Sequence, residues 1–155
     1  LGAEENDNYV KYLFFDLGVM QTMLGNPPSD TLLASEVDFV NKGAASEMFA
    51  GLELLKYHDC FQKAEMHYWQ NTAKNALSEV DYLIAKNGKV LPIEVKASTQ
   101  GSMQSLWVFM RKHRIHDGVR TSLENFGQLY YYDSAADQAE RFVRIIPLYA
   151  LSNLK

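Results

Sequence analysis

The sequence lacks the features of several common classes of protein. Among its 155 residues there is a single cysteine, Cys60, which excludes an internal disulfide framework and indicates a reducing compartment. No apolar run approaches the roughly 18 residues that a membrane-spanning helix needs, and no signal peptide is visible. We therefore expect a cytoplasmic protein with no membrane partner.

Positive charge is not in excess either. Lys and Arg together number 15 against 19 for Asp and Glu, so the formal net charge is −4. A nucleic-acid site would therefore have to be a local basic patch, because no global basic field is present. The four histidines lack zinc-ligand spacing. The phosphate-binding pattern G-x-x-x-x-G-K-[ST] is missing, so we expect no ATP hydrolysis by this piece.

The composition that remains is that of one globular unit. Apolar residues make up 47% of the chain, which is enough to bury a real core. We divide the chain into a leader with adaptor helices over residues 1–41 and a compact domain over 42–155. The first residue is Leu1 rather than Met, so we expect a fragment or a processed product.

The dipeptide Asn87-Gly88, between two β-rich runs, is the strongest local signal in the chain. It predicts a two-residue hairpin loop, so Ile84 should face Leu91. Side chains alternate along a strand, and one face of this hairpin should then be apolar. That face is expected to carry Val80, Tyr82, Ile84, Leu91, Ile93 and Val95.

The other face of the predicted hairpin carries charge. Counting outward, Asp81 faces Glu94 and Glu79 faces Lys96. Two like charges placed directly opposite each other destabilise a sheet, so this pair needs a compensating cation. Lys96 supplies one, and a divalent metal such as Mg²⁺ would supply a better one. The alternative is a solvated face with ordinary surface charges.

A helix is predicted upstream, over residues 42–58. Its spacing places Ser46, Ala50, Glu53 and Tyr57 on the solvent-exposed face. Glu47 lies on the flank of the helix, and Gly51 leaves room beside it for a metal or a substrate backbone. The alternative is a boundary glutamate that reaches out to solvent.

The remaining elements follow from capping and turn residues. Strands are predicted over 9–15, 65–70, 119–123 and 141–146, with another apolar segment over 129–132. Helices are predicted after Asp16, over 29–40, over 102–113 and after Pro147. From residue 42 the order is helix, strand, strand, strand, helix, strand. The helix over 102–113 ends among Arg111, Lys112 and Arg114. These cations either complement the helix C-terminus or form a phosphate-binding patch.

Two resemblances follow from these residues. Asp81, followed after twelve residues by Glu94-Val95-Lys96, resembles the D-x(n)-E-x-K signature of the PD-(D/E)XK nuclease superfamily. Longer stretches resemble the uncharacterised C-terminal domain of bacterial and archaeal AAA-type ATPases, itself regarded as nuclease-like. Among them are KYLFFDLGVM, GAASEMFAGLELL and EVDYLIAKNGKVLPIEVKAS.

The resemblance implies an α/β (α+β) fold with a restriction-endonuclease-like αβββαβ core, in which helices flank a mixed central sheet. It also implies a site for Mg or Mn. The implied ligands are Asp81, Glu94, Glu47 and the main-chain carbonyl of Val95. Lys96 would orient the attacking water, with Glu79 keeping Lys96 charged and Ser98 in support.

The expected function is Mg-dependent phosphodiester hydrolysis on DNA or RNA, in the service of an upstream ATPase module absent from this chain. Two other functions remain open. The domain is alternatively a non-catalytic DNA-binding or protein-docking module, or an oligomerisation domain whose carboxylates are plain surface charge.

Overall fold

The computed structural model describes residues 1–3, 5–27, 29, 42–71, 78–98, 101–134 and 137–154. The helix predicted over 29–40 lies outside the described residues, apart from Ser29. In the described part of the chain, no helix has the length and apolar character of a transmembrane span.

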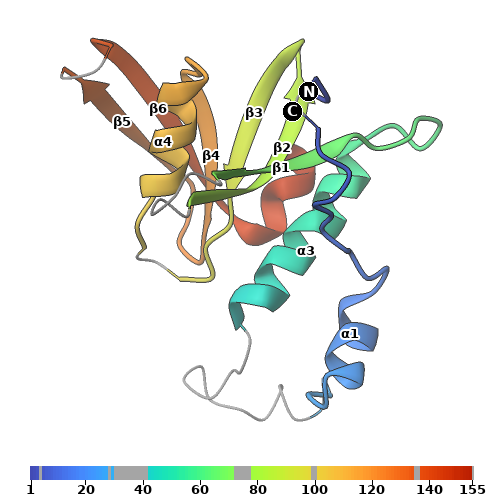
Figure 1. Ribbon diagram of the computed structural model, residues 1–155. Helices are drawn as coiled ribbons and strands as arrows, with labels where there is room; N and C mark the ends of the chain where they lie inside the picture. Colours follow the sequence, from blue (N-terminus) through green and yellow to red (C-terminus); the bar gives the residue numbers. More distant parts are fainter. Residues whose placement is uncertain are drawn as a thin grey trace.

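One mixed sheet organises the described residues (Figure 1). Its strands are β1 (Met66–Asn71), β2 (Ser78–Lys86), β3 (Lys89–Glu94), β4 (Asp117–Ser122), β5 (Gly127–Asp133) and β6 (Ala139–Pro147). The strand order is β1-β2-β3-β4-β6-β5. The pairs β3–β4 and β4–β6 are parallel and the others antiparallel.

Helices cover both faces of this sheet (Figure 1): α3 (Lys42–Tyr57) and the 3-10 helix η1 (Leu148–Asn153) lie on one face, and α4 (Gln104–Lys112) lies on the other. The short helix α1 (Leu17–Met23) contacts α3. From α3 to β4 the elements run helix, strand, strand, strand, helix, strand, which confirms the predicted order. Asp16 caps α1 as expected, because its carboxylate accepts a hydrogen bond from the Val19 N–H at 2.9 Å.

Two hydrophobic cores lie on opposite faces of the sheet. One core joins α3 and η1 to β2 and β3 through residues such as Leu54, Ile84 and Leu151. The other joins α4 to the sheet through residues such as Leu83 and Phe109. The central strands are therefore buried on both sides, and neither face of the hairpin is simply solvated.

The predicted hairpin register is confirmed as far as the pairing extends. Tyr82 pairs with Ile93, and Ile84 pairs with Leu91. Asn87 and Gly88 both have positive φ, at 51° and 72°, as the two central residues of a type I′ turn require.

The predicted facing of β2 is wrong at Val80. Between its pairs with His67 and Trp69, β2 advances by three residues while β1 advances by two. This extra residue is a β-bulge, which turns the strand and breaks the alternation of its side chains. Val80 consequently joins Leu83 in the core under α4 instead of lying beside Tyr82.

The segment over residues 9–15 is not a strand, contrary to the sequence prediction. It runs alongside α3 toward α1 (Figure 1). Of its apolar side chains Leu13 packs inward, whereas Val10, Tyr12 and Phe15 are exposed. A methyl carbon of Leu13 lies so close to Gly51 that a Cβ built there would be 2.7 Å away. The space expected beside Gly51 is therefore filled by Leu13, and by the Tyr82 hydroxyl at the same distance.

The predicted solvent-exposed face of α3 is also wrong in part. Ala50 is fully buried and Glu53 is 8% exposed, whereas Leu55 is 38% exposed. The helix packs against both the sheet and η1, so its buried stripe is wider than one contact face would make it. Glu53 is compensated by an ion pair with Lys56.

This packing predicts opposite effects for alanine at the two glycines of α3. Gly51→Ala should lower the free energy of unfolding by about 1–3 kcal/mol, because the new methyl group meets Leu13 and Tyr82. Gly43→Ala, which meets nothing within 4 Å, should raise it by up to about 1 kcal/mol, since alanine favours a helix. Urea unfolding of both variants measures the difference, and equal stability would contradict the close packing at Gly51.

Candidate functional site

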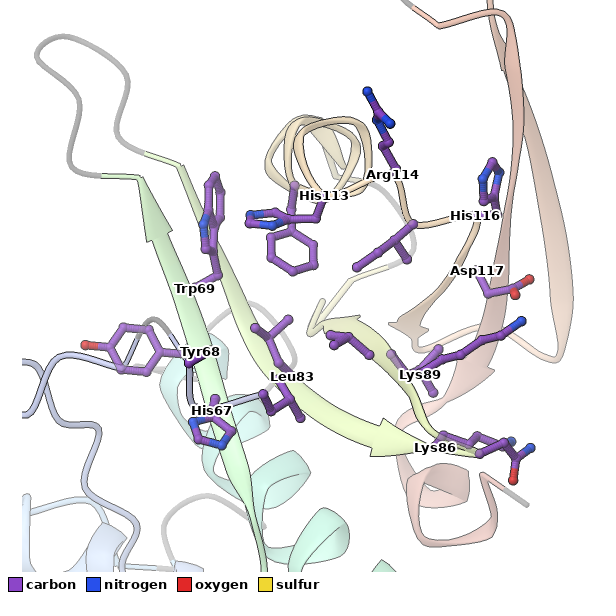
Figure 2. A pocket seen from close by; sticks show the side chains of 18 of the residues that line it. His67, Tyr68, Trp69, Leu83, Lys86, Lys89, His113, Arg114, His116 and Asp117 are labelled. Atoms are coloured by element: carbon purple, nitrogen blue, oxygen red, sulfur yellow. The ribbon is translucent and has the colours of Figure 1, made fainter.

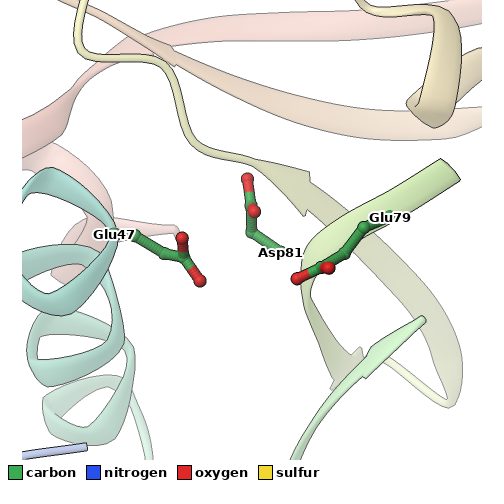
Figure 3. A group of neighbouring side chains, drawn as sticks. All are labelled: Glu47, Glu79 and Asp81. Atoms are coloured by element: carbon green, nitrogen blue, oxygen red, sulfur yellow. The ribbon is translucent and has the colours of Figure 1, made fainter. Parts of the chain in front are cut away.

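Three carboxylates from two elements meet on the α3 side of the sheet. Glu47 comes from α3, and Glu79 and Asp81 come from β2. One oxygen of each lies within 4.8 Å of those of the other two, and all three residues are half-buried. Figure 3 shows Glu47, on α3, facing Glu79, on β2, with the Asp81 side chain between them. The bulge in β2 makes this possible because it presents both of its acids to the helix.

An ammonium group that the sequence analysis missed lies among these acids. Lys11 Nζ is 2.5 Å from Glu47 Oε1, 2.8 Å from Glu79 Oε1 and 3.4 Å from the carbonyl oxygen of Asp81. The same ammonium lies 5.0 Å from the ring centroid of Tyr68. Burial by itself would lower the pKa of Lys11, but the hydrogen bonds to Glu47 and Glu79 outweigh it and raise the pKa.

One signal for Lys11 was present in the sequence. It is the only charged residue in the run YVKYLFF, and a lone charge in an apolar segment is often buried against a partner. The sequence could not indicate which acids it would meet.

Asp81 is fixed by the neighbouring strand. Its Oδ2 accepts a hydrogen bond from the Val95 N–H at 2.7 Å. Burial raises the pKa of Asp81 to about 7, and the nearby charges of Glu94 and Glu47 add to the rise, while the bond from Val95 opposes it. An acid with such a pKa exchanges protons near neutrality, which is typical of functional sites.

Glu94 and Lys96 form an ion pair at the end of β3. Lys96 Nζ lies 2.6 Å from Glu94 Oε1, and Glu94 is only 5% exposed. Burial raises the pKa of Glu94, although the hydrogen bond and charge of Lys96 oppose this. Glu94 Oε2 is buried and has no hydrogen-bond partner within the described part of the chain. An unsatisfied buried carboxylate oxygen is costly unless something binds it.

The backbone around Lys96 is held by β4. The Lys96 N–H donates to Thr121 Oγ1 at 2.8 Å, and the Thr121 hydroxyl donates to the Lys96 carbonyl at 3.2 Å. Lys96 therefore leaves the sheet in a defined direction although the strand has ended. Ser98 follows in an exposed bend.

The partner of Glu79 differs from the expectation. Glu79 was expected to hold Lys96, but it binds Lys11, while Lys96 pairs with Glu94. Among the described residues around Asp81 there are two ion-pair groups, Lys11 with Glu47 and Glu79, and Lys96 with Glu94. Asp81 lies near both, since the charges of Glu47 and Glu94 each act on its pKa.

The three basic residues at the end of α4 do not act as one patch. Arg111 Nε lies 3.1 Å from the buried carboxylate of Asp133. Lys112 Nζ lies 5.4 Å from the ring centroid of Trp69. Arg114 alone of the three lines a large pocket.

That pocket, of about 860 Å³, lies between the hairpin and the C-terminal end of α4 (Figure 2). Its apolar lining includes Trp69, Leu83, Val90, Phe109 and Ile115. Its cationic lining consists of Lys86, Lys89, Arg114 and Arg144, against the acids Glu5 and Asp117.

The hairpin tip concentrates positive charge in this pocket. Lys86 and Lys89 pair directly across the strands, and burial followed by the charge of Arg144 lowers the pKa of Lys86. The Lys86 ammonium also donates to the Leu154 carbonyl. The sequence analysis missed all three cations, although Lys86 and Lys89 flank the predicted turn.

The comparison with protein families agrees with one of the two resemblances. A family model, described as a domain of unknown function (DUF4143), matches residues 42–151, which run from α3 into η1. The chain belongs to the DUF4143 family. Domains of this family are often found with AAA ATPases. No curated protein matches the sequence of this DUF4143 domain.

The burial of Asp81 predicts a pH-dependent stability of the metal-free DUF4143 domain. Its pKa is about 7 in the folded state against 3.8 for an unperturbed aspartate, so the folded protein keeps a proton that the unfolded chain loses. The contribution of Asp81 to stability is therefore fully present below about pH 4 and is lost as the pH rises through about 7.

Asp81→Asn removes this titration while keeping an oxygen for the Val95 N–H. Relative to wild type, the free energy of unfolding of the variant should rise by about 1–3 kcal/mol as the pH goes from 4 to 7.5. The expected rise is reduced by solvent screening, because the Asp81 side chain is part-exposed. Urea unfolding at several pH values, in chelator, measures the gain. A difference that does not change with pH would contradict the raised pKa.

Proposed function

We propose that this domain is a divalent-metal-dependent phosphodiesterase that cleaves nucleic acid, built on a restriction-endonuclease-like αβββαβ core. The observation that carries the proposal is the meeting of Glu47, Glu79 and Asp81 beside the Glu94–Lys96 pair. Carboxylates and an ammonium gathered from α3, β2 and the end of β3 are suited to phosphoryl chemistry.

The donor set fits Mg²⁺ or Mn²⁺. These ions take carboxylate oxygens, and Glu94 Oε2 is a buried acceptor that lacks a partner among the described residues. Asp81 and Glu47, whose oxygens converge with that of Glu79, would hold the ion, with Glu94 and the Val95 carbonyl completing the set. A bound ion would supply Lewis-acid stabilisation of a phosphoryl oxygen.

The residues of the chain provide positioning and charge. Lys96, held at 2.6 Å from Glu94, would orient the attacking water and stabilise the negative charge that develops on the phosphorus oxygens. The Val95 N–H fixes the carboxylate of Asp81. The Tyr82 hydroxyl donates to the Glu47 carbonyl at 2.8 Å and so ties α3 to the sheet at this level.

The cationic pocket supports nucleic acid as the substrate class. Lys89, Arg114 and Arg144 can neutralise phosphates, and Trp69 offers a ring against which a base can stack. The pocket lies on the α4 side of the sheet and the acids on the α3 side, and Tyr68, on the edge strand β1, lines the pocket and also contacts Lys11.

A second function is favoured by a specific observation. An ion-paired Lys11 already compensates two of the acids, as would suit a domain that binds without cleaving. In this alternative the domain is a cytoplasmic nucleic-acid-binding or docking module that serves an AAA-type ATPase.

The cleavage proposal predicts a loss of activity in two variants. Asp81→Asn and Lys96→Met should each lower Mg²⁺- or Mn²⁺-dependent cleavage of DNA or RNA by at least about 100-fold, because each removes a group that acts on the reacting phosphate. Lys63→Met, at an exposed lysine, is the matched control and should cleave like wild type. Equal residual activity in all four proteins would point to a contaminating nuclease and end the proposal.

The binding pocket yields a separate prediction. Single-stranded DNA should bind the metal-free domain with a strong salt dependence, since phosphate contacts release counterions. Lys89→Gln and Arg114→Gln should each reduce the slope of log affinity against log salt by about 1. Lys63→Gln should leave the slope unchanged. Unaltered slopes in the two pocket variants would show that the pocket does not bind phosphates.

A further inference from the structure

The acidic cluster already contains a cation that belongs to the chain. Lys11 Nζ lies within 2.8 Å of a carboxylate oxygen of Glu47 and of one of Glu79, and 3.4 Å from the Asp81 carbonyl. The rings of Tyr68 and Tyr82 lie 5.0 Å and 5.4 Å from the same ammonium. Oxygens and aromatic faces around a positive charge make a built cation site.

A divalent ion among the same carboxylates would compete with this ammonium. The three acids offer oxygens within 4.8 Å of one another, so an ion bound by them would lie a few ångströms from Lys11. Two like charges at that separation repel strongly in a half-buried site. The two cations therefore exclude each other.

The segment that delivers Lys11 is held by few contacts. It has no regular secondary structure, and its other large side chains face outward, with Tyr12 83% and Phe15 85% exposed. Lys11 and Leu13 are the two residues of this segment with described contacts to the α3 side of the sheet. Withdrawal of the Lys11 side chain, with Leu13 still packed beside Gly51, would therefore leave the sheet and α3 intact.

We propose that Lys11 is a built-in plug of the metal site: residues 9–15 close the site at rest, and a divalent ion binds only when Lys11 withdraws. This inference rests on the proposed metal site. The plug keeps the three acids compensated in the absence of metal and sets the metal concentration at which the site can work.

The first experiment compares Mn²⁺ affinity by titration calorimetry in the full chain. Lys11→Met keeps the length of the side chain without its charge and should bind Mn²⁺ at least about tenfold more tightly than wild type. Lys11→Arg keeps the charge and should stay within about threefold of wild type. Asp81→Asn in the Lys11→Met background should lose the gain. Equal affinities of wild type and Lys11→Met would overturn the plug.

The second experiment uses the wild-type protein, so it does not depend on whether a variant folds. The Lys11 side chain is 22% exposed, and its acetylation, followed by mass spectrometry, should be slow in chelator. Saturating Mg²⁺ should speed it several-fold, while the exposed Lys89 serves as the internal reference and should not change. A Lys11 rate that Mg²⁺ leaves unaltered would overturn the plug.

The outcomes separate this inference from the proposed function. Tighter Mn²⁺ binding by Lys11→Met than by wild type, without nucleic-acid cleavage, would support the plug and contradict the proposed nuclease activity. Cleavage by wild type, with the same Mn²⁺ affinity in wild type and Lys11→Met, would support the nuclease and contradict the plug. If neither protein binds Mn²⁺, both are overturned.

Discussion

The site depends on the compensation of negative charge in a half-buried place. Glu47, Glu79 and Asp81 cannot all be ionised at such close range without a cation, and the structure supplies the ammonium of Lys11. Burial raises the pKa of Asp81 to about 7, and the charges of Glu94 and Glu47 add to the rise, while the ammonium of Lys11 opposes it.

The two cores determine which charges can meet. Since helices cover both faces of the sheet, a polar side chain on β2 or β3 must find its partner within a crowded layer. The bulge in β2 sends Glu79 and Asp81 toward α3, while Glu94 is buried beside Lys96. The site therefore lies at the open end of the hairpin, opposite the turn, and is not confined to one face of the hairpin.

Local chemistry explains what the sequence could predict. The turn at Asn87-Gly88 fixed the register through positive φ at two adjacent residues, and it depends on no distant contact. The gathering of Glu47 with Asp81 was expected only from a family resemblance. The contacts of Lys11 span 36 to 70 residues of sequence, and the bulge depends on pairing with β1. Neither leaves a periodic pattern, so both were missed.

The bulge also means that the site is encoded in the length of the chain as well as in its side chains. Removal of one residue between Val80 and Leu83 would restore a regular ladder with β1. The two residues at this place, Asp81 and Tyr82, both reach Glu47 on α3, and a regular strand would present only one of them to the helix. Homologues that lack the extra residue would therefore keep either the acid or the tyrosine that ties α3 to the sheet, but not both on this face.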